Sequence, residues 1–588
     1  MHVVATAGHV DHGKSTLVEA LTGMAPDRLE EERRRGLSIQ LGYCWTSLPG
    51  AGDVAFVDVP GHERFIATTL SGVGPVPAVM FVVAADDPWM PQAAEHLAAL
   101  DALGVERGVL VVTRSDLADP APALARARAE LAGTSLRDVP SVTVSGRTGA
   151  GLDDLRGVLA RVLASLPAQD ADAAVRLWVD RRFHVRGTGT VVTGTLPAGT
   201  VSAGDLLHVH GLDGVEARVR GIECLGRPVA TVTGTARVAL DLGGHAPEQV
   251  TRGSVLVTPD SFERADVVDV RLRGEGRPPE RPLLHAGAAS VTVHARPLSA
   301  DLFRLVLERP LPVRIGDRGI LRDPGSRAMW GVRVLDPAPP PLGRRGSAAL
   351  RAKELADADG STVSEVDRRG LVRRSLLRRV GAAGDLPAEA VEAGGWVLSG
   401  ERAADLRARL VAVVRDTGTP AQPWVPLTQA ARLLGLPDDR LVAALVSPPL
   451  ELSGGRLRDR RAADLPVGLV APLEALRADL AARPFGAPDA ARLAELGLGP
   501  RDLAVLARAG HVLRVAETVV LLPGADDQAT DVLRELPEPF SVSEAREALG
   551  STRRVVLPLL AHLDRTGRTL RMADDRRCVR RRGNARMN

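Results

Sequence analysis

The chain has 588 residues, of which 45% are hydrophobic, so it is too long for one hydrophobic core and predicts about three to five soluble domains. No apolar run reaches the roughly 20 residues that a membrane span needs, and a strand-like segment starts too early to leave room for a signal peptide. The three cysteines lie far apart, which argues against a zinc site or a disulfide framework and favours the cytoplasm.

The positive charge is almost all arginine, and Lys14 and Lys353 are the only lysines. The formal net charge of +3 is small, but it is unevenly distributed. From Ser551 to Asn588 the chain carries eleven Arg against three Asp, an excess of eight. This end favours contact with a polyanion, and a solvated basic tail is the alternative.

Residues 1–170 alternate apolar, β-rich runs with helical stretches, which predicts a mostly parallel sheet covered by helices. The predicted helices are Gln92–Leu103 and Leu152–Ser165, and the clearest strands are Val54–Val59, Val79–Ala84 and Val109–Thr113.

A glycine-rich motif that fits G-x-x-x-x-G-K-[ST] follows the first predicted strand and precedes a helix. Backbone N–H groups of such a loop and the N-terminal end of the helix bind phosphates, the lysine lies between the β- and γ-phosphates, and the hydroxyl binds Mg²⁺. The predicted phosphate-binding residues are Gly8, His9, Val10, Asp11, His12, Gly13, Lys14, Ser15 and Thr16.

Two further segments complete the predicted phosphate and Mg²⁺ site. Asp58-Val-Pro-Gly61 ends a strand, so Asp58 can reach Mg²⁺ and the Gly61 N–H can meet the γ-phosphate. His62 follows directly and is predicted to orient the attacking water, which makes it the predicted catalytic residue. In the charged stretch 34–39, Ser38 is predicted to bring a second hydroxyl to Mg²⁺ in a segment that GTP orders.

Two loops are predicted to bind the guanine base. Thr113, Arg114 and Asp116 occupy the place of the usual N-K-x-D motif, so Asp116 can accept hydrogen bonds from the base and Arg114 can stack on it. Thr113 lacks the amide that normally braces this loop. The second loop is Ser145, Gly146 and Arg147, whose backbone N–H groups face the base oxygen.

Beyond residue 170 the pattern changes twice. Short β-branched runs between Gly, Pro and Asp turns predict two β-barrels, at 171–258 and 259–336, followed by a proline-rich linker at 337–346. Residues 347–588 repeat helix, helix and β-hairpin, which predicts about four winged-helix units, the last at about 526–588. The predicted fold is therefore an α/β P-loop domain, two β-barrels and an array of α+β winged helices.

Three motifs together resemble the translational GTPases: G-H-V-D-H-G-K-S at 8–15, R-R-G-L-S-I at 34–39 and D-V-P-G-H-E at 58–63. The run Gly187-Thr-Gly-Thr-Val-Val-Thr-Gly194 resembles the start of the second domain that elongation factor Tu shares with SelB. Elongation factor Tu ends after its second barrel, whereas this chain continues for about 240 residues. A C-terminal string of winged helices is typical of the selenocysteine-specific elongation factors, SelB, and the chain resembles that family.

This resemblance implies a cytoplasmic GTPase that uses Mg²⁺ with GTP or GDP and carries selenocysteinyl-tRNA to the ribosome at a recoded UGA codon. It implies an aminoacyl pocket made by Asp180, Arg181 and Arg237. The two arginines could instead be surface charges of the barrel. We expect no membrane partner and a monomer.

The resemblance also implies that the last winged helix binds the selenocysteine insertion hairpin of the mRNA. Arg553, Arg554, His562 and Arg565 lie on or beside its predicted recognition helix. A winged helix can equally bind DNA or pack against another domain. Two other functions remain open: a general aminoacyl-tRNA-delivery GTPase of the elongation factor Tu type, and a nucleotide-switched RNA- or DNA-binding regulator.

Overall fold

The computed structural model describes residues 1–26, 40–62, 66–74, 76–87, 89–187, 189–244, 247–326, 328–418, 424–460 and 467–580. Contacts divide the chain into two units, residues 1–387 and 388–588. In the described part of the chain, no helix combines the length and apolar character that crossing a membrane requires.

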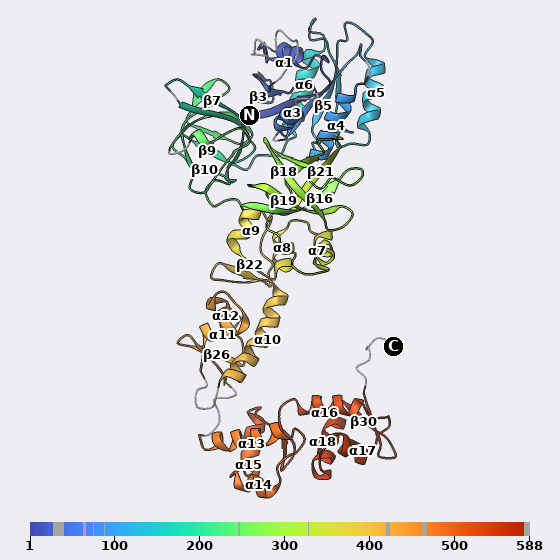
Figure 1. Ribbon diagram of the computed structural model, residues 1–588, viewed down its shortest axis with the longest axis vertical. Coiled ribbons are helices and arrows are strands. Elements are labelled where there is room, and N and C mark those ends of the chain that lie inside the picture. The colour runs from blue at the N-terminus through green and yellow to red at the C-terminus, as the bar shows by residue number, and fades with distance from the viewer. Residues whose placement is uncertain are drawn as a thin grey trace. The chain divides into compact units, whose positions relative to one another are not determined.

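The N-terminal domain is built on a six-stranded sheet with the order β2-β3-β1-β4-β5-β6 (Figure 1). Only β2 runs antiparallel to its neighbour, β3; the other pairs are parallel. The strands are β1 (His2–Ala7), β2 (Gly42–Leu48), β3 (Gly52–Asp58), β4 (Ala78–Ala84), β5 (Gly108–Thr113) and β6 (Ser141–Thr143).

Helices cover both faces of this sheet, which is why its strands are continuous apolar runs rather than alternating ones. Alternate strand residues enter two separate cores: Met80 and Val82 of β4 pack with α1 (Lys14–Thr22) and α6 (Leu152–Ala164), whereas Phe81 packs with α4 (Pro91–Leu103) and α5 (Ala121–Leu131). A fifth helix, α3 (Ile66–Val73), follows the D-V-P-G-H segment. Because the parallel strands end at one edge, the loops after β1, β3, β5 and β6 meet there.

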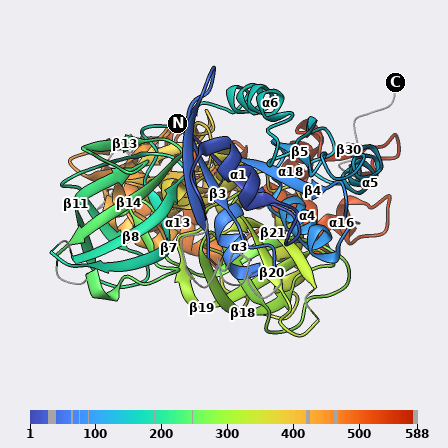
Figure 2. The same cartoon turned by 90° about the horizontal axis from the view of Figure 1, so that it is seen from above.

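The first barrel has the strand order β10-β15-β7-β8-β14-β11-β12, and pairing of β10 with β11 closes it (Figure 2). Its strands are β7 (Arg176–Val185), β8 (Gly189–Leu196), β10 (Leu206–Val209), β11 (Glu216–Cys224), β12 (Arg227–Val229), β14 (Ala236–Gly243) and β15 (Val255–Val257). Two short strands, β9 (Thr200–Ser202) and β13 (Thr231–Thr233), pair separately, and η2 (Pro247–Gln249) precedes β15.

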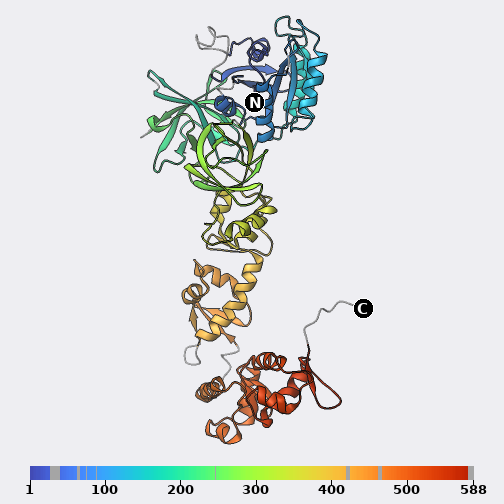
Figure 3. The ribbon, with the colours of Figure 1, turned by 45° about the vertical axis from the view of Figure 1, so that its right-hand side comes forward.

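The second barrel is a closed ring of six strands in the order β16-β19-β18-β17-β20-β21 (Figure 3). They are β16 (Ala265–Arg273), β17 (Leu283–Ala286), β18 (Ala289–Pro297), β19 (Leu302–Leu311), β20 (Arg318–Arg322) and β21 (Met329–Asp336). Alternating apolar side chains, among them Val268, Val270 and Leu305, fill its interior.

The first helical module belongs to the same unit as the barrels. It contains α7 (Ser347–Ala356), α8 (Thr362–Arg369), β22 (Leu371–Arg373) and α9 (Arg374–Val380). Asp336, at the end of the second barrel and fully buried, accepts hydrogen bonds from Arg351 at 2.5 Å, Arg368 at 2.7 Å and Arg369 at 2.6 Å. The segment predicted as a linker therefore lies beside a buried ion-pair network, and Arg304 donates to its Pro340 carbonyl.

The second unit begins with a hairpin and then repeats one pattern three times: three helices followed by a two-stranded hairpin. The hairpin is β23 (Val391–Ala393) and β24 (Trp396–Leu398), and the first repeat is α10 (Gly400–Thr417), β25 (Val425–Pro426), α11 (Leu427–Leu434), α12 (Asp439–Leu445), β26 (Leu450–Ser453) and β27 (Arg456–Asp459). The second repeat is η4 (Val467–Leu469), α13 (Val470–Ala482), α14 (Ala490–Glu495), α15 (Pro500–Arg508), β28 (Leu513–Ala516) and β29 (Val519–Leu521). The third is α16 (Ala525–Arg534), α17 (Val542–Ala548), α18 (Arg553–Arg565), β30 (Thr569–Arg571) and β31 (Arg577–Val579).

The second and third repeats share one hydrophobic core, which runs from Leu469 to Val579 and includes the fully buried Phe540. The predicted fold class, an α/β P-loop domain followed by β-barrels and winged helices, is confirmed.

Candidate functional site

The loop between β1 and α1 has a backbone that only glycine can adopt at its first position. Gly8 has φ +133°, and a Cβ added there would lie 2.1 Å from the carbonyl oxygen of Val82. The loop is therefore pressed against β4. Gly13, with φ +80°, ends the loop as the N-cap of α1, so the N-terminal end of the helix, with its positive dipole, faces the loop.

Lys14 turns back into this loop and is largely buried, with 7% of its surface exposed. Its Nζ donates to the carbonyls of Gly8 at 3.1 Å and His9 at 2.6 Å. Gly61 lies against the same group, because a Cβ added there would come within 2.7 Å of the Lys14 Nζ and 2.6 Å of the Val10 nitrogen. The segment after β3 and the phosphate loop thus converge on one ammonium group.

Oxygen ligands suited to Mg²⁺ meet beside Lys14. The Ser15 hydroxyl donates to Asp58 Oδ2 at 2.6 Å, and Thr6 donates to Asp58 Oδ1 at 2.6 Å. Asp58 is fully buried, and these two hydrogen bonds hold its carboxylate in place. A hydroxyl beside a carboxylate is a hard-oxygen ligand set, so these residues fit the predicted metal. Ser38, the third predicted ligand, lies outside the described residues.

His62 follows Gly61 and is half-buried. Because Gly61 contacts the phosphate loop, the histidine lies at the edge of the predicted phosphate site.

Thr113 braces the phosphate loop through its hydroxyl. Its Oγ1 donates to the His12 carbonyl at 2.7 Å, and the Val83 carbonyl of β4 lies 3.2 Å away as an alternative acceptor. Thr113 lacks the amide that normally braces the predicted guanine loop, and its hydroxyl contacts the phosphate loop instead. Arg114 has φ 57° and donates to Asp86 and to the Asp11 carbonyl, which fixes it beside the same loop.

The two predicted guanine loops meet at Asp116 and Ser145. The hydrogen bond from Ser145 holds the pKa of Asp116 below its usual range, so the carboxylate stays ionised as an acceptor. Gly146 lies against Thr16, since a Cβ there would be 3.3 Å from the threonine methyl. Arg147 is exposed at the tip.

His9 and His12 of the phosphate loop pack edge to face, with their ring centroids 5.0 Å apart. Burial, the neighbouring His9 and Lys14 lower the pKa of His12 to about 4, although Asp87 lies 3.2 Å from its Nε2. His12 is therefore neutral near neutral pH, and it supports the loop by packing rather than by charge. His96 of α4, which sequence analysis did not predict, also contacts this loop through Gly8.

The three predicted aminoacyl-pocket residues come together on β7 and β14. Arg237 makes a two-pronged ion pair with Asp180, with Nη2 2.7 Å from Oδ1. Thr193 donates to the same carboxylate at 2.8 Å. The side chains of Asp180 and Arg237 are 3% and 10% exposed, so the pair is buried. Arg237 alternates along β14 with the residues that fill the barrel, so it lies on the outer side of the barrel.

Tyr43 of β2 completes this cluster and was not predicted. Its ring centroid lies 3.8 Å from the Arg237 guanidinium carbon and 4.3 Å from that of Arg181. Burial raises the pKa of Tyr43, so it remains a neutral phenol. A cavity of about 270 Å³ opens beside the cluster, with Phe183 and Thr193 in its wall. Tyr43 and Arg237 are far apart in sequence, and no local motif marks their contact.

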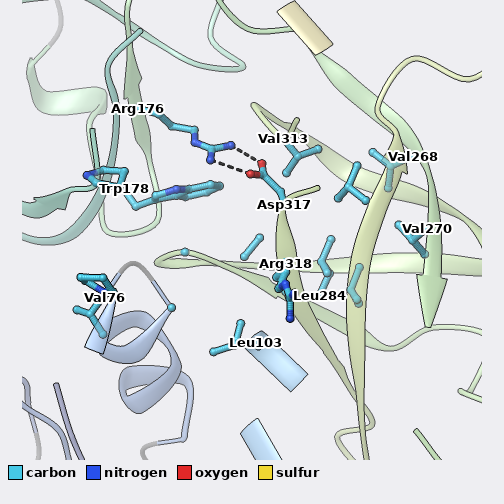
Figure 4. Close-up of a pocket in the computed structure, with 18 of the residues that line it drawn as sticks. Val76, Leu103, Arg176, Trp178, Val268, Val270, Leu284, Val313, Asp317 and Arg318 are labelled. Atoms are coloured by element: carbon cyan, nitrogen blue, oxygen red, sulfur yellow. Dashed lines mark hydrogen bonds and ion pairs between the residues drawn. The ribbon is translucent and has the colours of Figure 1, made fainter. Parts of the chain in front are cut away.

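A separate cavity of about 310 Å³ lies where the N-terminal domain meets both barrels (Figure 4). Barrel side chains such as Val268 and Leu284 make its apolar wall, and the ion pair of Arg176 with Asp317 lies at its rim. None of the predicted site residues lines it.

At the C-terminal end, the four predicted hairpin residues have different surroundings. Arg553 is exposed at the start of α18, whereas Arg554 donates to the carbonyls of Ala487 at 2.5 Å and Pro488 at 2.9 Å in the preceding repeat. Arg565 is exposed and lies 3.4 Å from His562 Nδ1, and His562 Nε2 lies 3.8 Å from Asp526. Arg553 and Arg565 thus face solvent, while Arg554 joins two repeats.

Family models match three parts of the chain. The elongation factor Tu GTP binding domain matches residues 1–165, the beta-barrel domain of the selenocysteine-specific elongation factor matches 282–341, and the winged helix of elongation factor SelB matches 531–578.

Comparison with whole proteins also finds selenocysteine-specific elongation factors. The selenocysteine-specific elongation factor of Escherichia coli (strain K12) is 35% identical over 376 residues, which cover 61% of this chain and 60% of that protein. Translation initiation factor 2 subunit gamma of Methanothermobacter thermautotrophicus is 30% identical over 46% of this chain and 75% of that protein. The chain spans about 60% of the length of the selenocysteine-specific factors that it matches.

Among solved structures, a bacterial selenocysteine-specific elongation factor, EF-Sec, aligns with a TM-score of 0.68 and 26% identity, covering 99% of this chain and 100% of that one. The phosphate loop, the D-V-P-G-H segment and these matches agree. The chain therefore belongs to the translational GTPases and, within them, to the family of selenocysteine-specific elongation factors, SelB.

Proposed function

We propose that this chain binds GTP with Mg²⁺, carries selenocysteinyl-tRNA to the ribosome at a recoded UGA codon, and hydrolyses the GTP there. The observation that carries the nucleotide part is the convergence of Lys14, Gly61 and the Ser15–Asp58 pair on one loop. Family membership and the barrel pocket support the tRNA part.

Hydrolysis in this site depends on positioning and electrostatics, since GTP hydrolysis needs no protein nucleophile. Lys14 and the N-terminus of α1 stabilise the triphosphate, the Gly61 N–H is placed to detect the γ-phosphate, and His62 orients the attacking water. When bound, Mg²⁺ would be held by Ser15 and Asp58, with Ser38 as the further predicted ligand, and it neutralises charge that develops on the phosphate oxygens.

Selectivity for selenocysteine would reside in the pocket of Asp180, Arg181 and Arg237, to which the geometry adds Tyr43. A selenol is largely ionised at neutral pH and a serine hydroxyl is not, so a cationic pocket favours the selenolate through charge-assisted hydrogen bonds. Asp180 pairs with Arg237, and Arg181 stacks on the rings of Tyr43 and Phe183 in the wall of the cavity of about 270 Å³. We assign Arg181 to the selenolate because its side chain lines that cavity.

The mRNA hairpin would bind the last winged helix. Arg553 and Arg565 are exposed there, and arginine contacts to phosphates and unpaired bases suit RNA loops. Binding should weaken steeply as salt is added and should require the unpaired bases. Equally tight binding to random duplex DNA would favour a DNA-binding regulator instead.

The nucleotide part is tested by titrating fluorescent GDP in the presence of Mg²⁺. Lys14→Gln should weaken binding by at least about tenfold, because a charged hydrogen-bond donor to phosphate is lost. Lys353→Gln is the matched control, since Lys353 is the only other lysine and is exposed on α7. Wild-type protein that binds no guanine nucleotide would contradict the proposal.

The tRNA part is tested by competition between selenocysteinyl-, seryl- and ordinary aminoacyl-tRNA for the GTP-bound protein. Arg181→Ala should reduce binding of selenocysteinyl-tRNA far more than binding of GTP. Equal affinity for all three tRNAs would instead identify a general delivery factor.

A further inference from the structure

A buried histidine on α4 is bonded to the first residue of the phosphate loop. The backbone N–H of Gly8 donates to His96 Nδ1 at 3.1 Å, and His96 is 3% exposed. Burial, together with the charges of Lys14 and His9, lowers the pKa of His96 to about 3. The ring is therefore neutral, with Nδ1 as its acceptor and the proton on Nε2.

The hydrogen bond to His96 restricts the backbone of Gly8, the first residue of the phosphate loop. Its N–H is held by His96 and its carbonyl by Lys14, so both polar groups of the residue are fixed. The close approach to Val82 prevents the loop from moving toward β4. Without an acceptor at Nδ1, the N–H would be buried without its partner, and the loop would relax to find another one.

The neighbouring residues of α4 dock on the second barrel. Glu95 lies 3.5 Å from Arg322 of β20, and their side chains are 17% and 15% exposed. One turn further, Ala99 packs with Ile320 of β20 and with Leu70 of α3. Figure 2 shows α4 beside β20 and β21, and the contacts agree. A single rigid helix thus contacts the phosphate loop and the barrel through consecutive residues, Glu95 and His96.

We propose that His96 is a positioning residue that holds the phosphate loop in its nucleotide-binding shape, and that α4 makes this hold depend on docking of the second barrel. The inference rests on the proposed nucleotide site. It adds to that site a route by which the position of a barrel changes the rate at which nucleotide leaves.

The test measures the dissociation rate of fluorescent GDP from the full chain with Mg²⁺. His96→Leu fills the space without an acceptor and should accelerate dissociation by about tenfold or more. His96→Asn places its Oδ1 where Nδ1 lies and should stay within about threefold of wild type, whereas His96→Gln places the oxygen one carbon further out and should resemble His96→Leu. Should His96→Leu fail to fold, the Asn and Gln variants still decide the question.

The link to the barrel is tested by a double-mutant cycle. Arg322→Met should accelerate dissociation in the wild-type background but add little to His96→Leu, because both changes act through one helix. Arg333→Met is the matched control on the exposed face of the adjacent strand β21 and should have no effect.

The outcomes separate the two proposals. If the wild-type protein has no affinity for GDP, the proposed nucleotide site is wrong. Wild-type binding combined with unchanged rates in His96→Leu, or with equal rates in the Asn and Gln variants, overturns the role of His96 alone. Additive effects of Arg322→Met and His96→Leu overturn the coupling through α4.

Discussion

The guanidinium carbon of Arg237, in the first barrel, lies 3.8 Å from the ring centroid of Tyr43, in strand β2 of the GTPase domain. The pocket proposed for the amino acid is therefore closed on one side by the domain proposed to bind GTP. β2 begins at Gly42, shortly after the stretch 34–39 that GTP is predicted to order, so we expect the nucleotide state to affect the shape of the proposed pocket.

Tyr43→Ala should weaken binding of selenocysteinyl-tRNA by about 1–2 kcal/mol, roughly five- to thirtyfold, because two cation–π contacts are lost. GDP affinity should not change. Tyr43→Phe keeps the ring and should behave nearly as wild type. A tRNA-protection assay measures the affinity for selenocysteinyl-tRNA, and titration with fluorescent GDP measures the affinity for GDP. If both affinities fall in parallel, the ring supports the fold and not the pocket.

His62→Ala should lower ribosome-stimulated GTP hydrolysis by about a hundredfold or more, because water orientation is lost. Nucleotide affinity should remain close to wild type, since the phosphates are proposed to bind Lys14 and the loop to which it is bonded rather than His62. Multiple-turnover phosphate release with ribosomes measures the effect. An unchanged rate would mean that another group orients the water.

Asp336→Asn should destabilise the first unit by about 3–5 kcal/mol, because three arginines would each lose one of their buried carboxylate partners and keep only Asp269 or Glu365 as a buried partner. Asp301→Asn, at an exposed pair with Arg271, should cost at most about 1 kcal/mol. Chemical unfolding of Asp336→Asn and Asp301→Asn measures the difference in their stability. Equal denaturant midpoints would contradict the role of Asp336 in stabilising the first unit.

The same residue predicts a pH dependence. Burial opposes ionisation of Asp336, but Arg369, Arg368 and Arg351 together hold its pKa below the usual value. A lowered folded-state pKa contributes stability above the unfolded value of about 4, and this contribution disappears as the pH falls further. The difference in the free energy of unfolding between wild type and Asp336→Asn should therefore become smaller below about pH 4.

Arg554→Ala should lower the stability of the second unit by about 1–3 kcal/mol, because the Ala487 and Pro488 carbonyls lose their donor. Arg553→Ala should leave stability within about 0.5 kcal/mol of wild type but weaken hairpin binding and its salt dependence. Thermal unfolding and RNA titration at several salt concentrations separate the two. A stable Arg554→Ala variant with lost RNA binding would assign Arg554 to the RNA instead.

The parts of the site that sequence predicted are local. The phosphate loop, Asp58, Gly61 and His62 lie in short motifs whose backbone requirements are visible in the residues themselves, and α4 and α6 were located to within one residue at each end. Tyr43, His96 and the partners of Asp336 were missed, because each acts across a contact between segments far apart in the chain. Thr113 was judged by the residue it replaces, although its hydroxyl can donate where an amide would. Ser38 remains a prediction.

The hydrophobic core common to the last two repeats has a practical consequence for dissecting the protein. A fragment that starts at residue 526 would present the partners of Phe540 and Leu559 to water and should aggregate, whereas residues 467–580 carry the complete core. Heat or urea should melt that longer piece in one cooperative step. The shortest fragment expected to keep the proposed RNA-binding helix folded is thus the tandem of the last two repeats.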